Sequence, residues 1–164
     1  MLTGKEDLLQ ALIDAYIMEK GTREFYAQAA QKALDPEARK TFNELSAWEN
    51  RHMEFIQFLY QAITDDRDIK GFEDFSNKSH APAAEGSRPL KDLEAKMEKF
   101  DFLDDTGAIT MALEIEGKAY NLYHRLSKIA PDTNAKVVFK DMMEQEIKHI
   151  DHLKSMMLKL SETS

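Results

Sequence analysis

The chain repeats itself at a fixed offset of 97 residues, and this repeat restricts the fold more than any other feature of the sequence. The identical pairs are acids, aromatic residues, histidines and small residues, and no gap is needed across either copy. They include Ala11 and Ala108, Ala15 and Ala112, Glu19 and Glu116, Tyr26 and Tyr123, Asp35 and Asp132, Ala38 and Ala135, Phe42 and Phe139, Glu49 and Glu146, and His52 and His149. Two unrelated amphipathic segments would match at Leu, Ala and Lys rather than at both acids and histidines. We therefore predict a duplicated helical hairpin whose copies meet around a pseudo-twofold axis at a central site.

Apolar residues recur every three or four positions in four segments, which predicts four long helices. The first helix is expected at about 5–33. The second is expected at about 36–64, with Asp35 as N-cap and Pro36 in its first turn. The third is expected at about 104–129, and the fourth from just after Pro131-Asp132 to about 160. On the second helix the residues expected to face inward are Phe42, Leu45, Trp48, His52, Phe55, Ile56, Leu59 and Ile63.

Residues 65–103 differ from the helical segments because they are polar and rich in turn-forming residues, so we expect a long crossover. Phe72 and Phe75 are candidates to pin this crossover to the helices, and 90–99 reads as a short amphipathic piece. Two helix pairs, about 5–64 and 104–160, joined by one crossover predict an all-α four-helix bundle of two repeated hairpins. The length suits a single domain spanning 1–164.

Two Glu-x-x-His motifs, one in each copy of the repeat, predict a metal site. Their residues are Glu49 with His52 and Glu146 with His149, and residues three apart on a helix share one face. Glu19 and Glu116 lie on the inward faces of the partner helices and complete a set of six ligands. Two divalent cations would balance four buried carboxylates, and this mix of ligands favours iron or manganese over structural zinc. We expect one Glu-x-x-His motif for each metal ion, with the remaining glutamates bridging.

Other polar residues of the predicted core have less certain roles. Tyr26 and Tyr123 lie two turns beyond Glu19 and Glu116, where they either donate hydrogen bonds to ligand carboxylates or serve as core aromatics. His152 is one turn beyond His149 but repeats Phe55, so it is expected in the core or at the rim of the site.

The composition excludes several function classes. The net charge of −8 disfavours binding to nucleic acid or to anionic membranes. The sequence contains no cysteine, which excludes disulfides, iron–sulfur clusters and a rubredoxin iron centre within these residues. No apolar run is long enough to span a membrane, and the first residues do not resemble a signal peptide.

The ligand motifs resemble those of the rubrerythrin branch of the ferritin-like superfamily. The resemblance rests on Glu19 with Tyr26, on the motif at 49–52, on Glu116 with Tyr123, and on the motif at 146–149, and it covers about 5–160. It implies a ferritin-like four-helix bundle that holds two iron ions, with manganese or zinc as substitutes, and that reduces hydrogen peroxide in the cytoplasm. It also implies a homodimer.

Two departures from the rubrerythrin pattern bear on activity. A C-terminal rubredoxin module is absent from these residues, so electrons would come from an external donor such as a rubredoxin. Rubrerythrins also carry an extra glutamate three residues after the third-helix ligand, where this sequence has Ala119. Three functions therefore remain open: an oxidoreductase acting on peroxide or oxygen, an iron-handling or ferroxidase protein without sustained turnover, and an interaction bundle with structural metals.

Overall fold

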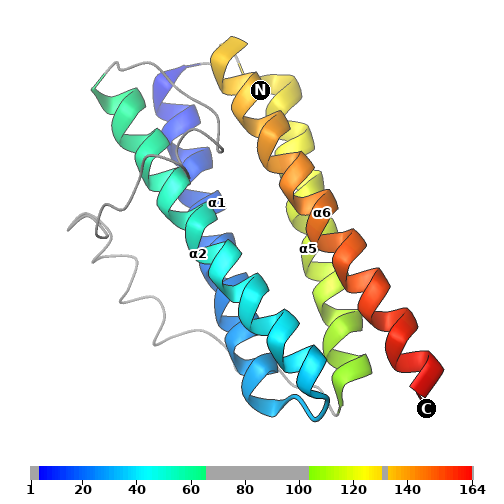
Figure 1. The fold of residues 1–164 in the computed structure, drawn as a ribbon. Helices are drawn as coiled ribbons and strands as arrows, with labels where there is room; N and C mark the ends of the chain where they lie inside the picture. The colour runs from blue at the N-terminus through cyan, green and yellow to red at the C-terminus, as the bar shows by residue number, and fades with distance from the viewer. Residues whose placement is uncertain (1–3, 66–103, 131–132, 164) are drawn as a thin grey trace.

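The computed structural model describes residues 4–65, 104–130 and 133–163, and these residues form four long helices and no strand (Figure 1). The helices are α1 (Lys5–Lys32), α2 (Pro36–Thr64), α5 (Asp105–Ile129) and α6 (Thr133–Thr163). α1 packs along α2, α5 packs along α6, and α1 also contacts α5. The all-α four-helix bundle predicted from the sequence is confirmed. The expectations for Phe72, Phe75, the piece at 90–99 and the break at Pro131-Asp132 fall outside the described residues.

Side-chain caps fix where two of the helices begin. The Asp35 side chain accepts a hydrogen bond from the backbone N–H of Glu37, with Pro36 in the first turn, as expected. Asp104 caps α5 in the same way, by accepting from the backbone N–H of Gly107 at 2.8 Å. The neighbouring Asp105 accepts hydrogen bonds from the backbone of the α1–α2 turn, including a 2.8 Å bond from Asp35. This contact ties the start of the second hairpin to the turn of the first.

The apolar core consists of two clusters, one toward each end of the bundle. One cluster combines the first half of α1 and the second half of α2 with the second half of α5 and the first half of α6. The other combines the complementary halves. The repeat partners Phe42 and Phe139 lie one in each cluster, and burying each aromatic ring is worth about 1.5–3 kcal/mol. The two clusters leave a polar layer between them, halfway along the helices.

Trp48 does not face inward as the periodicity of α2 suggested. Its side chain is 40% exposed, whereas Leu45, Glu49 and His52 are buried. These three residues define the inward stripe of α2, and position 48 lies to one side of it. The indole lies at the surface instead, with the Arg51 guanidinium 5.9 Å from its ring centroid. None of the described helices has a stretch long and apolar enough to cross a membrane.

Candidate metal centre

The polar layer between the two apolar clusters contains all six residues that the sequence singled out. Each helix contributes to it: α1 carries Glu19, α5 carries Glu116, and α2 and α6 each carry one Glu-x-x-His motif. The four glutamates and His52 are at most 1% exposed, and His149 is 5% exposed. The four glutamates are the only buried acids among the described residues. The sequence repeat thus becomes a cluster of four carboxylates and two imidazoles.

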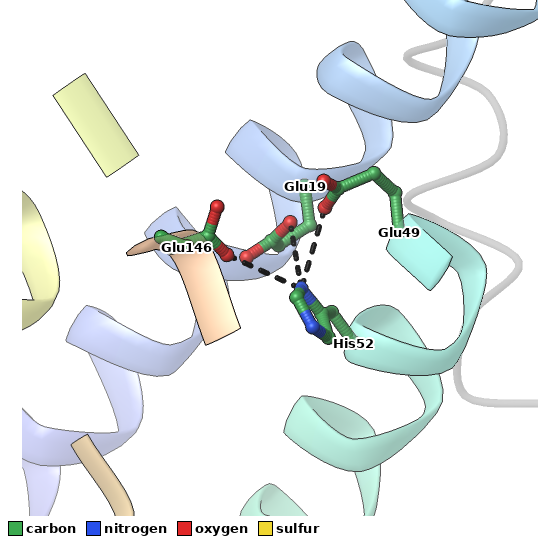
Figure 2. A group of neighbouring side chains, drawn as sticks. All are labelled: Glu19, Glu49, His52 and Glu146. Carbon is green, nitrogen blue, oxygen red and sulfur yellow. Dashed lines mark ion pairs between the residues drawn. The ribbon is translucent and has the colours of Figure 1, made fainter. Parts of the chain in front are cut away.

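The cluster divides into two overlapping groups of four residues. One consists of Glu19, Glu49, His52 and Glu146, and the other of Glu49, Glu116, Glu146 and His149. Within each group, one candidate ligand atom per residue lies within 4.8 Å of every other. Figure 2 shows the first group, in which three carboxylates from three helices converge on one ring nitrogen of His52. Each group has the size of a site for one metal ion.

The two histidines occupy equivalent positions in the cluster. The Nδ1 atom of His52 lies 3.4 Å from a Glu49 oxygen and 3.3 Å from a Glu146 oxygen. The Nδ1 atom of His149 lies 3.1 Å from Glu49 and 3.9 Å from Glu146. The two rings stack with their centroids 5.2 Å apart and an interplanar angle of 12°. Both imidazoles therefore direct the same nitrogen toward the same pair of carboxylates.

The carboxylates shared by the two groups are those of Glu49 and Glu146, rather than those of Glu19 and Glu116. Glu19 contacts only the His52 side, at 3.6 Å, and Glu116 only the His149 side, at 3.2 Å. The sequence pattern predicts that each Glu-x-x-His motif serves one metal ion and that the glutamates of α1 and α5 bridge, and this assignment of roles stays a prediction. In the structure, the motif glutamates lie near both histidines, whereas Glu19 and Glu116 each lie near one.

Two tyrosine hydroxyls contact the two glutamates that are not shared between the groups. Tyr26 donates a hydrogen bond to Oε1 of Glu116 at 2.6 Å, and Tyr123 donates one to Oε1 of Glu19. Each bond crosses from one copy of the repeat to the other. In Glu116 the oxygen that accepts from Tyr26 also lies 3.2 Å from Nδ1 of His149, and the second oxygen, Oε2, has no hydrogen-bond partner among the described residues. Burial and the nearby carboxylates raise the pKa of both hydroxyls well above 10, so they remain donors.

Without a cation, the shared carboxylates resist ionisation. Burial raises the pKa of Glu49 and of Glu146 well above 4.5, and the charges of Glu19 and Glu116 raise it further. Burial also opposes ionisation of Glu116, but hydrogen bonds with Glu146 and His149 lower its pKa to about 2. In the metal-free protein, Glu49 and Glu146 therefore hold protons, whereas Glu116 stays ionised.

Glu19 and His52 form the corresponding ionised pair on the other side. Burial opposes the charge of Glu19, but a hydrogen bond with Glu49 and the charge of His52 lower its pKa. Burial also opposes protonation of His52, yet the charge of Glu19 and a hydrogen bond with Glu146 raise the pKa of the imidazole well above 6.5. Protons on these groups compensate charge in the place that metal ions would take.

The donor set fits a pair of divalent cations. Apart from protons held within the cluster itself, none of the four side-chain oxygens of Glu49 and Glu146 has a hydrogen-bond donor among the described residues, and neither does Oε2 of Glu116. A buried carboxylate oxygen without a partner is costly, and a cation removes that cost. Two divalent ions balance four carboxylates, and oxygen-rich ligands with one imidazole per ion suit iron or manganese. Metal binding by these six residues remains a prediction that their geometry supports.

A family model described as Rubrerythrin matches residues 1–100. The chain belongs to the rubrerythrin family. Within the matched residues lie α1 and α2, with Glu19, Glu49 and His52. The repeat partners of these three residues, on α5 and α6, are Glu116, Glu146 and His149, and they lie beyond the match. They are assigned by the internal repeat and by their position in the cluster. Membership of this family suggests a di-iron protein.

A crystal structure of a two-domain protein from Anabaena variabilis, with DJ-1/ThiJ/PfpI-like and ferritin-like domains, resembles this rubrerythrin with a TM-score of 0.71. The sequences are 18% identical, and the similarity covers 99% of this chain and 39% of the other. At this identity it supports the ferritin-like fold alone. No curated protein matches the chain.

The position of the extra rubrerythrin glutamate carries no carboxylate in the structure. Ala119 is 2% exposed and packs in the apolar cluster that also holds Tyr123. Its repeat partner Thr22 is also buried, and the Thr22 hydroxyl donates to the backbone carbonyl of Met18 at 3.0 Å. Neither half of this rubrerythrin therefore adds a fifth carboxylate to the described polar layer.

Two buried polar residues of the helices were not predicted from the sequence. Lys20 and Gln145 are buried, although the repeat gives no sign of it because their partners are Gly117 and Trp48. His152 is exposed at the rim, one of the two positions considered for it. The only signal for His152 was its mismatch with Phe55 in the repeat.

Proposed function

We infer that this chain is a di-iron redox protein that reduces hydrogen peroxide or dioxygen. Six residues would hold the two iron ions: Glu19, Glu49, His52, Glu116, Glu146 and His149. One ion would have Glu19 and His52 as its own ligands, and the other would have Glu116 and His149. The iron pair, when bound, supplies one electron from each ion to an oxygen–oxygen bond, with manganese or zinc as substitute metals.

The observation that carries this proposal is the pair of shared carboxylates. Two overlapping groups of ligands with Glu49 and Glu146 in common are suited to two adjacent metal ions rather than to two separate ones. A structural zinc site would need only one closed set of four ligands, usually with more nitrogen or sulfur. A pair of bridged ions is suited to a reaction in which two electrons leave together.

The residues around the cluster maintain the conditions for this reaction. Tyr26 and Tyr123 hold the side chains of Glu116 and Glu19 in place through hydrogen bonds to one oxygen of each. The two apolar clusters exclude water from both ends of the polar layer, which strengthens the electrostatic interactions inside it. Cleavage of peroxide to two water molecules consumes two electrons and two protons, which must be resupplied for each turnover.

The electron donor in this proposal is an external protein such as a rubredoxin. The 164 residues contain no cysteine and so no rubredoxin iron centre. By its family, the protein is expected to act in the cytoplasm as a homodimer, without nucleic acid or membrane partners.

A second function, iron oxidation or iron handling without sustained peroxide turnover, is favoured by Ala119. The family's extra glutamate would offer an additional oxygen ligand at that position, and here an apolar methyl group packs into the core instead. A site with a fixed ligand set could bind and oxidise iron without cycling efficiently.

One experiment separates the two functions. Anaerobically iron-loaded protein is mixed with peroxide in the presence of rubredoxin and its reductase, and peroxide consumption is followed over many equivalents. Sustained consumption supports the redox enzyme. A single oxidation followed by arrest, together with iron uptake in proportion to protein, supports the iron-handling function.

A further inference from the structure

A surface hollow between α2 and α6 reaches one of the candidate ligands. Its volume is about 200 Å³, and its walls come from Glu44, Leu45 and Trp48 on α2 and from Gln145, Lys148, His149 and His152 on α6. His149 is the one member of the six-residue cluster among these lining residues. Figure 1 shows α2 and α6 along the same face of the bundle. The hollow therefore opens toward the metal centre from the outside of the bundle.

The internal repeat shows why the cluster is open on this side. His149 repeats His52, and His152 repeats Phe55. Phe55 is fully buried in an apolar cluster one turn beyond His52, and His52 is 0% exposed. His152 occupies the equivalent position one turn beyond His149, but its side chain is exposed, and His149 is 5% exposed. Where the apolar ring is replaced by an imidazole, the neighbouring histidine keeps a small exposed fraction and lines the hollow.

The size and charge of the hollow restrict what can enter. With about 30 Å³ for each molecule in liquid water, it holds roughly six waters, too few for a protein segment or a large organic reductant. Glu44 and Lys148 carry opposite charges, so the walls do not concentrate ions of either sign. Trp48 and Leu45 add apolar surface, and the Trp48 ring centroid lies 6.4 Å from that of His149. These walls suit a small uncharged molecule.

We propose that this hollow, between Trp48 and His152 with His149 at its base, is where the small uncharged oxidant enters the metal centre. The class of ligand is a molecule with an oxygen–oxygen bond, either hydrogen peroxide or dioxygen. The identity of the oxidant rests on the proposed function, but the route itself depends only on the shape of the protein. His152 controls access to His149 because its side chain lies at the surface. In the other copy of the repeat, the buried ring of Phe55 covers the position beside His52.

The test uses nitric oxide, which is a small uncharged probe that binds ferrous iron without turnover. Its association rate with anaerobic, iron-loaded protein is measured by stopped-flow absorption. His152→Phe copies the closed side of the repeat and should slow association by about tenfold, equivalent to ~1.4 kcal/mol of added barrier. His152→Ala should not slow it, and His124→Phe, the same exchange on α5 outside the hollow, should match the unmodified protein.

Two results would overturn the route. One is an association rate in His152→Phe equal to that of His124→Phe. The other is equal slowing by His152→Ala and His152→Phe, which would assign the effect to loss of the imidazole rather than to closure. The oxidant is identified by measuring the rate of a single oxidation of the same variants by peroxide and by dioxygen. Only the oxidant that uses this route should react more slowly in the variant that also slows nitric oxide association.

A metal-free measurement checks the same geometry independently of iron loading. Deuterium exchange at the imidazole C2 position, read by mass spectrometry as a full pH profile so that each imidazole's own pKa is accounted for, should be faster for His149 than for His52. His152→Phe should bring His149 close to the His52 rate, and equal rates in the unmodified protein would count against the route. If the unmodified protein shows no peroxide turnover but nitric oxide entry depends on His152 as predicted, the proposed function is refuted and the route stands. If peroxide is turned over but nitric oxide entry does not depend on His152, the route alone is refuted.

Discussion

Removing the Tyr26 hydroxyl tests whether the cross-repeat hydrogen bonds stabilise the metal centre. The 2.6 Å bond from Tyr26 to Glu116 is fully buried and has an ionised acceptor. A hydrogen bond to a charged group contributes about 1.5–3 kcal/mol to stability. Tyr26→Phe keeps the ring, which stacks on Phe42 and meets Phe25 edge to face, so packing is preserved. The loss should therefore come almost wholly from the hydroxyl.

We expect Tyr26→Phe to lower the unfolding free energy of the metal-loaded protein by about 2 kcal/mol. At ~2–4 °C per kcal/mol for a chain of this size, Tm should fall by about 4–8 °C. Metal affinity should fall by about 10–100-fold, as for other groups that orient metal ligands. The assays are a calorimetric melt and a competition titration with a chelator of known affinity.

Two further variants decide whether the reasoning holds. Tyr123→Phe removes the equivalent bond to Glu19 and should have a similar effect, because the repeat places the two tyrosines alike. Tyr120→Phe removes a hydroxyl on α5 from a ring that stacks on His124, outside the cluster, and should change stability by less than about 0.5 kcal/mol. Losses in the two cluster variants no larger than that of Tyr120→Phe would refute the account.

Three other predictions follow from the arrangement of the cluster. Each of the variants Glu49→Ala and Glu146→Ala should reduce the occupancy of both metal positions, measured by elemental analysis. The surface variant Glu114→Ala should leave the occupancy unchanged. Full occupancy in either cluster variant would contradict the bridging roles. The gain in Tm on adding Mn²⁺ should grow from about pH 5 to about pH 8. In metal-free protein the folded-state pKa values of Glu49, Glu146 and His52 are raised. Their bound protons therefore stabilise the fold below the unfolded-state pKa values, and this stabilisation is lost as pH rises through the folded-state values. Metal ions replace the protons, so their contribution grows over the same range. A gain that does not vary with pH would exclude this linkage. Ala119→Glu should raise peroxide turnover with a supplied reductant, and no increase would show that the extra glutamate is unnecessary here.

The sequence predicted the helices and the cluster because both depend on short-range spacing. Glu and His three residues apart share a helix face, and their recurrence 97 residues later marked both motifs as parts of one site. The end of α2 at Thr64 followed from the loss of periodicity. These features needed no knowledge of how the helices pack.

The features that the sequence did not predict depend on contacts between the two copies. Periodicity did not predict that the hydroxyls of Tyr26 and Tyr123 reach across the bundle, each to a glutamate of the other copy. Periodicity placed Trp48 on the inward side, but the buried residues Leu45, Glu49 and His52 show that position 48 lies beside the inward stripe of α2. The hollow beside His149 likewise became visible only when the burial of Phe55 and His152 was compared.

The central claim, a pair of bridged metal ions, is tested most directly by the metal content of protein purified from iron-fed cells, with Mössbauer spectroscopy of the oxidised form. The account predicts about two iron ions per chain and the diamagnetic spectrum of a coupled ferric pair. One ion per chain, or two ferric ions without magnetic coupling, would contradict the bridging roles of Glu49 and Glu146.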